Sequence, residues 1–118
     1  MIAVIFEFTA AAGRRQEYLD IAAALGERLK GFEGFISIER FQSLGDPDRY
    51  VSLSFWRDED AVRRWRNVQQ HREAQAKGRA GIFFDYRLRV AQVLRDYAKD
   101  RRAETPDDSL SFHGGIHG

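Results

Sequence analysis

The sequence predicts a single α+β domain of the ferredoxin-like type, with elements in the order β-α-β-β-α-β. Two segments place apolar side chains at helical spacing, four segments alternate with the period of a strand, and glycine or proline separates them. This order gives an antiparallel sheet with both helices on one face. The other face is then solvated or covered by a partner. We expect residues 1–98 to form this domain and residues 99–118 a C-terminal tail, flexible or ordered on a partner subunit.

Composition excludes several classes of protein. The 118 residues are enough for one domain with its own core. The net charge of +1 gives no electrostatic reason to expect binding to nucleic acid or to a membrane surface. The chain has no cysteine, so disulfides, thiolate nucleophiles and iron–sulfur clusters are excluded. No apolar run approaches the ~20 residues of a membrane span. The start, MIAVIFEF, reads as a strand rather than a signal peptide, and we expect a cytoplasmic protein.

The first strand is expected over residues 2–9. Both of its faces are largely apolar, which predicts a central strand covered on both sides. Glu7 is the exception and needs a partner or an opening to water, and we expect a salt bridge to Arg40 or Arg87 on a neighbouring strand or a role as a base. One face carries Ile2, Val4, Phe6 and Phe8, and the other carries Ala3, Ile5, Glu7 and Thr9.

A helix is expected next, over residues 14–30, with Gly31 as a glycine suited to its end. Strands over residues 35–44 and 50–56 follow, joined by a turn at residues 45–48. In the second of these strands Val51, Leu53 and Phe55 share one face. The apolar stripe of the helix consists of Tyr18, Ile21, Ala22, Leu25 and Leu29.

The second helix has a clear start signal. Asp58 supplies an N-cap carboxylate, and Glu59 and Asp60 place negative charge on the first turn, where the helix dipole favours it. The glycines at 78 and 81 mark the end of this segment. The helical stripe consists of Ala61, Val62, Trp65 and Val68.

The last strand is expected over residues 83–97, much longer than a typical strand of ~5–6 residues. We therefore expect its far half to pair with, or pack over, a second subunit. One face carries Phe84, Tyr86, Leu88, Val90 and Leu94, and the other carries Asp85, Arg87, Arg89, Ala91, Val93, Arg95 and Tyr97.

The run SFWRDEDAVRRWRN resembles the antibiotic biosynthesis monooxygenase family, as do QHREAQAKGR, FFDYRLRVAQVLRDY and the preceding EGFISIERFQS. The core of the resemblance is W-x-(D/E)-E-x-A-x-x-x-W after a strand, with His71 a short helical step later. It implies a dimeric α+β barrel of two facing sheets, so a homodimer through the open sheet face and the long last strand. It also implies a pocket between sheet and helices in each subunit. Family members include cofactor-free oxygenases of aromatic compounds, quinol oxygenases, haem-degrading monooxygenases and domains without a known reaction.

The resemblance argues against the haem-degrading branch, which uses an Asn on the first strand and a His ten residues after the helical Trp. The corresponding positions here hold Glu7 and Gln75, while His71 lies six residues after Trp65. Six residues correspond to about 120° around an unbroken helix.

The favoured function is a cofactor-independent monooxygenase that oxidises a small aromatic, phenolic or quinol-type compound with O2. Such a reaction needs an apolar, partly dry pocket with a base or hydrogen-bond donors near the substrate oxygen. No cofactor and no metal are expected. Candidate catalytic residues are His71, Glu7 and Tyr86, and candidate substrate-binding residues are Trp65, Asn67, Phe6, Phe8, Phe84 and Arg72.

Each candidate also has a purely structural interpretation. His71 suits a solvated helix surface, Trp65 and Trp56 suit core packing, and Tyr86 suits packing with an exposed hydroxyl. The tail histidines His113 and His117 lack a nearby third ligand, so we expect no metal there. The alternative function is a non-catalytic dimeric domain that binds a small molecule or serves in a stress response.

Overall fold

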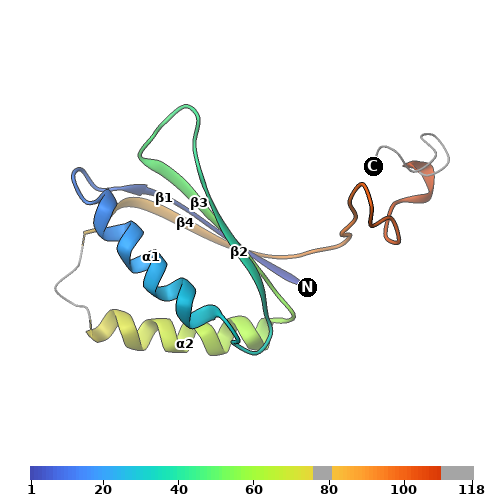
Figure 1. Ribbon diagram of the computed structural model, residues 1–118, viewed down its shortest axis with the longest axis horizontal. Coiled ribbons are helices and arrows are strands. Elements are labelled where there is room, and N and C mark those ends of the chain that lie inside the picture. Colours follow the sequence, from blue (N-terminus) through green and yellow to red (C-terminus); the bar gives the residue numbers. More distant parts are fainter. Residues whose placement is uncertain (76–80, 110–118) are drawn as a thin grey trace.

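The computed structural model describes residues 1–75 and 81–109, and the side chains of residues 1–68 and 81–109. Four strands and two helices follow one another in the predicted order β-α-β-β-α-β (Figure 1). This confirms the α+β, ferredoxin-like class. The elements are β1 (Ile2–Ala10), α1 (Arg15–Leu29), β2 (Phe35–Gln42), β3 (Arg49–Trp56), α2 (Glu59–Gln75) and β4 (Phe83–Gln92).

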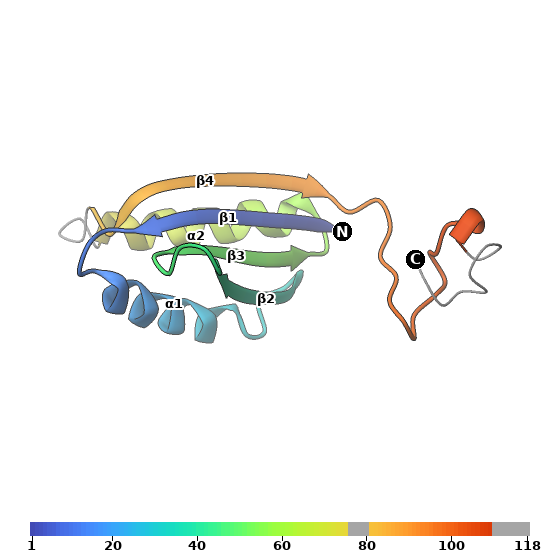
Figure 2. The same ribbon diagram turned by 90° about the horizontal axis from the view of Figure 1, so that it is seen from above.

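The strands form one antiparallel sheet in the order β2-β3-β1-β4, so β1 is central as predicted and β4 lies at an edge (Figure 2). Both helices lie on the same side of the sheet (Figure 1). We call this side the helix-covered face and the other side the open face. No helix in the described part of the chain is long and apolar enough to cross a membrane.

The register assigns side chains to the two faces, because residues directly opposite one another in a ladder point to the same side. Phe8 pairs with Tyr50 and Tyr86, and its ring packs 4.3 Å from that of Tyr18 of α1, so this row belongs to the helix-covered face. Its neighbour Glu7 belongs to the open face. The open face combines apolar side chains with charged ones: Ala3, Ile5, Glu7 and Thr9 of β1, Arg49, Val51, Leu53 and Phe55 of β3, Phe41 of β2, and Asp85, Arg87, Arg89 and Ala91 of β4.

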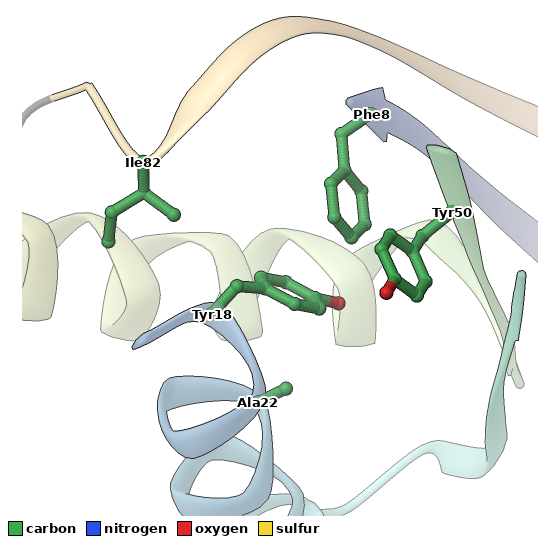
Figure 3. Packing of buried hydrophobic residues seen from close by; sticks show 5 residues of the cluster. All are labelled: Phe8, Tyr18, Ala22, Tyr50 and Ile82. Carbon is green, nitrogen blue, oxygen red and sulfur yellow. The ribbon is translucent and has the colours of Figure 1, made fainter. Parts of the chain in front are cut away.

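Two core clusters fill the space between the sheet and the helices. The first surrounds Phe8, which is fully buried, and joins β1 and β3 to α1 (Figure 3). The second surrounds Trp56, whose indole N–H donates to the Ser54 hydroxyl at 2.9 Å, and joins the sheet to α2. These clusters confirm most of both predicted stripes, but Leu25 belongs to neither cluster and Val68 is exposed. The first contains Phe8, Tyr18, Ala22, Tyr50 and Ile82, and the second contains Leu29, Trp56 and Ala61.

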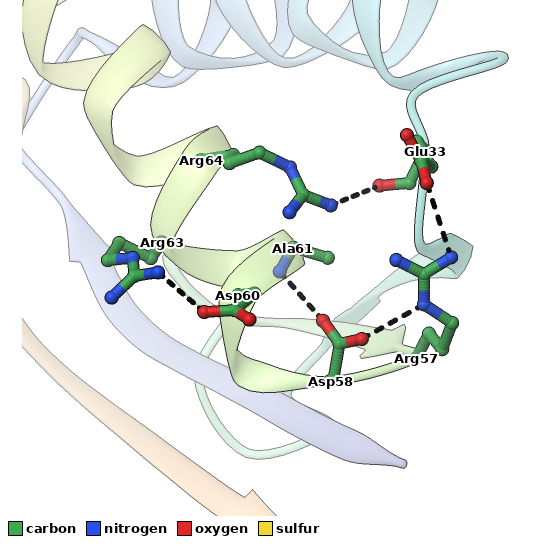
Figure 4. A network of polar contacts seen from close by, with 7 residues as sticks. All are labelled: Glu33, Arg57, Asp58, Asp60, Ala61, Arg63 and Arg64. Carbon is green, nitrogen blue, oxygen red and sulfur yellow. Dashed lines mark hydrogen bonds and ion pairs between the residues drawn. The ribbon is translucent and has the colours of Figure 1, made fainter.

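The start of α2 follows the predicted capping pattern. The Asp58 carboxylate accepts a hydrogen bond from the Ala61 amide at 2.9 Å and also pairs with Arg57, which in turn reaches Glu33 (Figure 4). The hydrogen bond from the Ala61 amide, helped by Arg57, lowers the pKa of the Asp58 carboxyl. The cap therefore stays ionised, which suits the positive end of the helix dipole.

The last strand is shorter than predicted. β4 ends at Gln92, which pairs with Ile2 at the beginning of β1, so the ladder has no further partner there. The Val93 amide still donates to the Met1 carbonyl at 3.0 Å. Beyond Val93 the chain leaves the sheet and extends away from the strands and both helices (Figures 1 and 2). The prediction of one strand up to Tyr97 was therefore wrong, although the chain does outrun its own sheet.

Candidate functional site

The helix-covered face carries an exposed apolar row on β4, formed by Tyr86, Leu88 and Val90. Their side chains are 66%, 55% and 45% exposed, although they lie on the face that forms the core elsewhere. The Tyr86 ring lies 5.9 Å from that of Phe6 and 6.2 Å from that of Phe83, so the row continues directly from the first core cluster. We call these three residues the apolar row of β4. The apolar row of β4 is therefore an exposed apolar surface on the side of the sheet where the helices lie.

The open face carries a different feature, a polar hollow of about 260 Å3 lined by Glu7, Arg49, Asp85, Tyr86 and Arg87. Four of these five residues are charged. Tyr86 borders both features, because it belongs to the lining of the hollow while its ring contacts Phe6 on the other side of the sheet. A hollow of this composition suits a polar contact better than an aromatic substrate.

Glu7 lies on the open face between two arginines. Its carboxylate pairs with Arg49 of β3 at 3.1 Å and with Arg89 of β4 at 3.0 Å. The expected salt bridge to a neighbouring strand is confirmed, but the partners proposed from the sequence were wrong. Arg40 instead points to the helix-covered face, where its Nε donates to the Tyr18 hydroxyl at 3.1 Å, and Arg87 lines the hollow. The structure therefore does not bring Glu7 together with Phe6 and Phe8.

Trp65 and Trp56 belong to the second core cluster. The Trp65 ring makes an edge contact with Phe32 at 5.4 Å and lies 6.4 Å from the Trp56 ring, which is 2% exposed. Trp65 itself is half-buried. Trp56 fulfils the predicted structural role, and Trp65 combines core packing with a partly exposed edge.

The remaining candidates lie at different depths. Phe8 is buried in the core and Phe6 is half-buried beside Tyr86, whereas Phe84 is 81% exposed. Asn67 is exposed on α2. His71 and Arg72 lie on α2, but their side chains are outside those that the structure describes, as are those of Gln75 and the tail histidines. Among the described candidates, the structure thus brings together Phe6, Phe8 and Tyr86.

The sequence interpretation did not name as site candidates the residues that complete these surfaces, which are Leu88, Val90, Arg49 and Asp85, or Arg89, which pairs with Glu7. The alternation of β4 already placed Leu88 and Val90 on the same face as Tyr86. The arginine partners of Glu7 depended on the register of three strands. A one-residue shift in register would have changed both partners.

Burial also perturbs one tyrosine near this site. The surroundings of Tyr18 raise the pKa of its phenol, because burial penalises the charged form, while the nearby Arg40 acts in the opposite direction. Tyr18 therefore stays neutral and accepts the hydrogen bond from Arg40. Within the described residues, no cluster of three or more histidine, aspartate or glutamate side chains could hold a metal ion.

Solved structures with the same fold include proteins of several bacteria. The structure of Rv0793 from Mycobacterium tuberculosis matches with a TM-score of 0.70 at 16% identity, covering 82% of this chain and 98% of that one. SnoaB, a cofactor-independent oxygenase from Streptomyces nogalater, matches with a TM-score of 0.66 at 17% identity, covering 80% and 94%. At these identities the likeness shows the fold alone.

Comparison of sequences, unlike the structural likeness, identifies the family. The jasmonate monooxygenase ABM of Pyricularia oryzae is 44% identical over 109 residues, which cover 91% of this chain and 51% of that protein. The chain spans about half the length of the curated relatives it matches. The model of the family described as antibiotic biosynthesis monooxygenase matches residues 1–77. The chain therefore belongs to the antibiotic biosynthesis monooxygenase family.

Proposed function

We propose that the protein is a monooxygenase without a resident cofactor, and that it oxidises a small aromatic, phenolic or quinol-type compound with O2 along the apolar row of β4. The observation that carries the proposal is the exposure of Tyr86, Leu88 and Val90 on the helix-covered face. Apolar side chains on that face would normally be packed under a helix. Here they offer a surface on which a ring system loses water on binding.

The chemistry follows from what such a substrate can supply. A base removes a proton from a phenol, a hydroquinone or an activated methylene, and the resulting anion passes an electron to O2. For an anthrone-type methylene the overall change is CH2 + O2 → C=O + H2O, in which the substrate provides all four electrons. No external reductant is needed. The protein has to bind the ring, hold the base and exclude bulk water.

Tyr86 is the described polar group best placed for this role, because its ring belongs to the row and ends in a hydroxyl. We propose that this hydroxyl donates to the substrate oxygen and that His71 of α2 acts as the base, with Asn67 and Arg72 as further polar contacts. Phe6 supports the row from β1, Phe84 extends it at the edge, and Trp65 closes it from α2. Glu7 is less suited to act as the base, because two arginines hold its carboxylate on the opposite side of the sheet.

Jasmonate is the second substrate candidate, favoured by the 44% identity to a protein named for it. Jasmonate is a cyclopentanone carboxylic acid without a phenol. Hydroxylation of one of its C–H bonds would leave the second oxygen atom to be reduced by two electrons from elsewhere. This candidate therefore predicts oxygen consumption that depends on an added reductant, whereas a phenolic substrate predicts consumption without one.

We also propose that the open face joins two copies into a homodimer. Its half-exposed Ile5, Leu53 and Phe55 offer apolar area, and the Glu7 cluster offers charge for orientation. A dimer of this kind leaves the apolar row of β4 on the outside of each sheet pair. The predicted cytoplasmic location stays a prediction.

The experiment combines binding and turnover. Ligand-dependent melting of the protein with hydroquinone, anthrone, jasmonate and haemin should give a rise in melting temperature with one class, since binding to the native state alone stabilises it. Oxygen consumption with that compound, measured with and without a reductant, then identifies the reaction. Tyr86→Phe should lower turnover by about 10- to 100-fold.

Three outcomes would count against the proposal. A melting shift without oxygen consumption would support a non-catalytic binding domain. A rise in melting temperature with haemin alone, accompanied by a histidine-ligated Soret band, would favour haem degradation instead. Unchanged turnover in Tyr86→Phe would remove Tyr86 from the reaction, and Tyr97→Phe, which removes a hydroxyl outside the apolar row, is the matched control.

A further inference from the structure

The helix-covered face of the sheet carries one positive charge. Among the residues that the described strand ladders place on this face, Arg40 of β2 is the single charged side chain. Arg40 is half-buried, and none of the ion pairs in the described part of the chain involves it. Its Nε donates to the hydroxyl of Tyr18, which is a neutral partner.

The arginines of the open face are in a different situation. Arg49 and Arg89 both pair with Glu7, and Arg87 lines the hollow together with Glu7 and Asp85. These positive charges are balanced by carboxylates of the chain itself. A half-buried guanidinium without a carboxylate beside it has lost part of its hydration and gained no ion pair in return, so an anion from outside is stabilised there.

Two tyrosine hydroxyls and a second arginine lie beside Arg40. Tyr18 accepts the hydrogen bond from Arg40 and, as a neutral phenol, still has a proton to donate. Gln42, two residues along β2, donates to the Tyr50 hydroxyl at 3.5 Å, and the hydroxyls of Tyr18 and Tyr50 point toward one another (Figure 3). Arg15 of α1 places its guanidinium carbon 5.8 Å from the centre of the Tyr50 ring. A guanidinium next to a phenol donor suits the two oxygens of a carboxylate.

Arg40 and the apolar row of β4 lie on one line across the sheet. The ladders place Arg40 opposite Ser52, Ser52 opposite Phe6, and Phe6 opposite Leu88. Adjacent strands are ~4.8 Å apart, so the backbones of Arg40 and Leu88 are separated by about 14 Å. The long side chain of Arg40 shortens this distance to one that a ring with an acidic substituent can span. Ser52, the small side chain in between, is only half-buried.

We infer that Arg40, together with the Tyr18 hydroxyl, binds a carboxylate of the substrate while the ring of the substrate lies on the apolar row of β4. One guanidinium balances one negative charge, which favours a carboxylate over a phosphate dianion. The inference rests on the function proposed above and narrows the substrate class to ring-containing carboxylic acids. Both substrate candidates fit this class if the phenolic compound carries a carboxylate, because jasmonate is itself a carboxylic acid.

The test uses three probes that share a naphthalene ring. 6-Hydroxy-2-naphthoate carries a hydroxyl and a carboxylate, 6-hydroxy-2-naphthamide has nearly the same shape without the charge, and 2-naphthol lacks the second group. Titration calorimetry measures the dissociation constant of each. We expect the unaltered protein to bind the naphthoate about tenfold or more tightly than the amide. Arg40→Gln should remove this preference, whereas Arg87→Gln, which changes an arginine of the open face, should retain it.

The possible results separate the carboxylate site from the proposed function. Equal affinities for the naphthoate and the amide in the unaltered protein would overturn the carboxylate site, while binding of 2-naphthol would leave the proposed function standing. Absence of binding by all three probes would overturn both. A preference that is lost in Arg87→Gln and retained in Arg40→Gln would move the carboxylate to the hollow and contradict the inference.

A second variant covers the case in which Arg40→Gln binds neither the naphthoate nor the amide. Arg40→Lys keeps the positive charge but replaces the guanidinium fork with an ammonium group. It should still bind the naphthoate about threefold or more tightly than the amide. Equal affinities for these two probes in Arg40→Lys would then contradict the inference.

Discussion

The two faces of the sheet differ in how deeply their side chains are buried and in what those side chains contact. On the helix-covered face, Phe8 is completely buried among aromatic rings from β3, β4 and α1. On the open face, the neighbouring Glu7 forms two ion pairs and remains partly exposed. Adjacent residues of one strand thus serve different purposes. The helix-covered face holds the core clusters that stabilise the fold, and we propose that its apolar row of β4 binds a small molecule and that the open face joins two copies.

The largest expected effect is a loss of stability in Phe8→Ala. Removing a fully buried ring that contacts four other aromatic residues should lower the free energy of unfolding by about 3–5 kcal/mol. Phe84→Ala is the matched control, because that ring is 81% exposed and its loss should cost less than about 1 kcal/mol. Urea unfolding measures both. Similar losses of stability would mean that burial in the first core cluster does not determine the cost.

Gly34→Ala tests how closely the loop before β2 packs against the start of α2. Gly34 has φ +89°, and an added Cβ would overlap the Cβ of Ala61, so we expect a loss of about 2–4 kcal/mol. Gly13→Ala is the control, because its φ is +75° and its added Cβ meets no atom within 4 Å. In thermal unfolding, the melting temperature of Gly34→Ala should be well below that of Gly13→Ala. Equal losses of stability would show that backbone strain, rather than the contact with Ala61, determines the cost.

Tyr18 should make stability sensitive to alkaline pH. Its pKa in the folded state is raised by burial, so its contribution to stability is fully present below the unfolded pKa of about 10 and is lost as pH rises through the folded-state value. Tyr18→Phe should cost about 1 kcal/mol at neutral pH through the lost bond from Arg40, and it should flatten the alkaline decline. An unchanged pH profile in the variant would contradict this assignment.

The smallest effect is expected for Glu7→Gln on the open face. Both ion pairs are partly exposed, so after solvent screening their loss should cost about 0–1 kcal/mol in a monomer. The loss of stability should be smaller still in 0.5 M salt, because salt screens the ion pairs. Thermal melts of both proteins at two salt concentrations measure this loss. A loss several times larger at protein concentrations that favour the proposed dimer would indicate that the second copy buries the cluster, and a loss that large in the monomer would contradict the exposed ion pairs.

Much of the fold followed from local patterns. The stripe of α1 followed from the helix period and the start of α2 from the cap at Asp58. The alternation of β4 placed the apolar row on one face, but Phe83 rather than Phe84 packs against the core, because the register of β1 and β4 shifts at that end. The end of β4 could not be predicted in this way. It depends on where β1 begins in the ladder, which is a property of the register.

The site was only partly predictable, for the same reason. Tyr86 and Phe6 were identified by residue type, and the structure places them together at 5.9 Å. Glu7 has the chemistry of a base, but its position on the other side of the sheet follows from strand alternation combined with the placement of the helices. The sequence pattern showed two faces without showing which one the helices cover.

The most direct test of the two-face account uses adjacent residues of β4. Leu88 belongs to the apolar row and Arg87 lines the hollow of the open face, so Leu88→Trp and Arg87→Trp place an indole ring on opposite sides of the sheet. Titration calorimetry with 2-naphthol, a stable phenolic probe, measures binding in both. The account predicts that Leu88→Trp weakens binding about tenfold or more while Arg87→Trp stays within about twofold of the unaltered protein. Loss of binding in Arg87→Trp alone, or equal affinity in both variants, would contradict it.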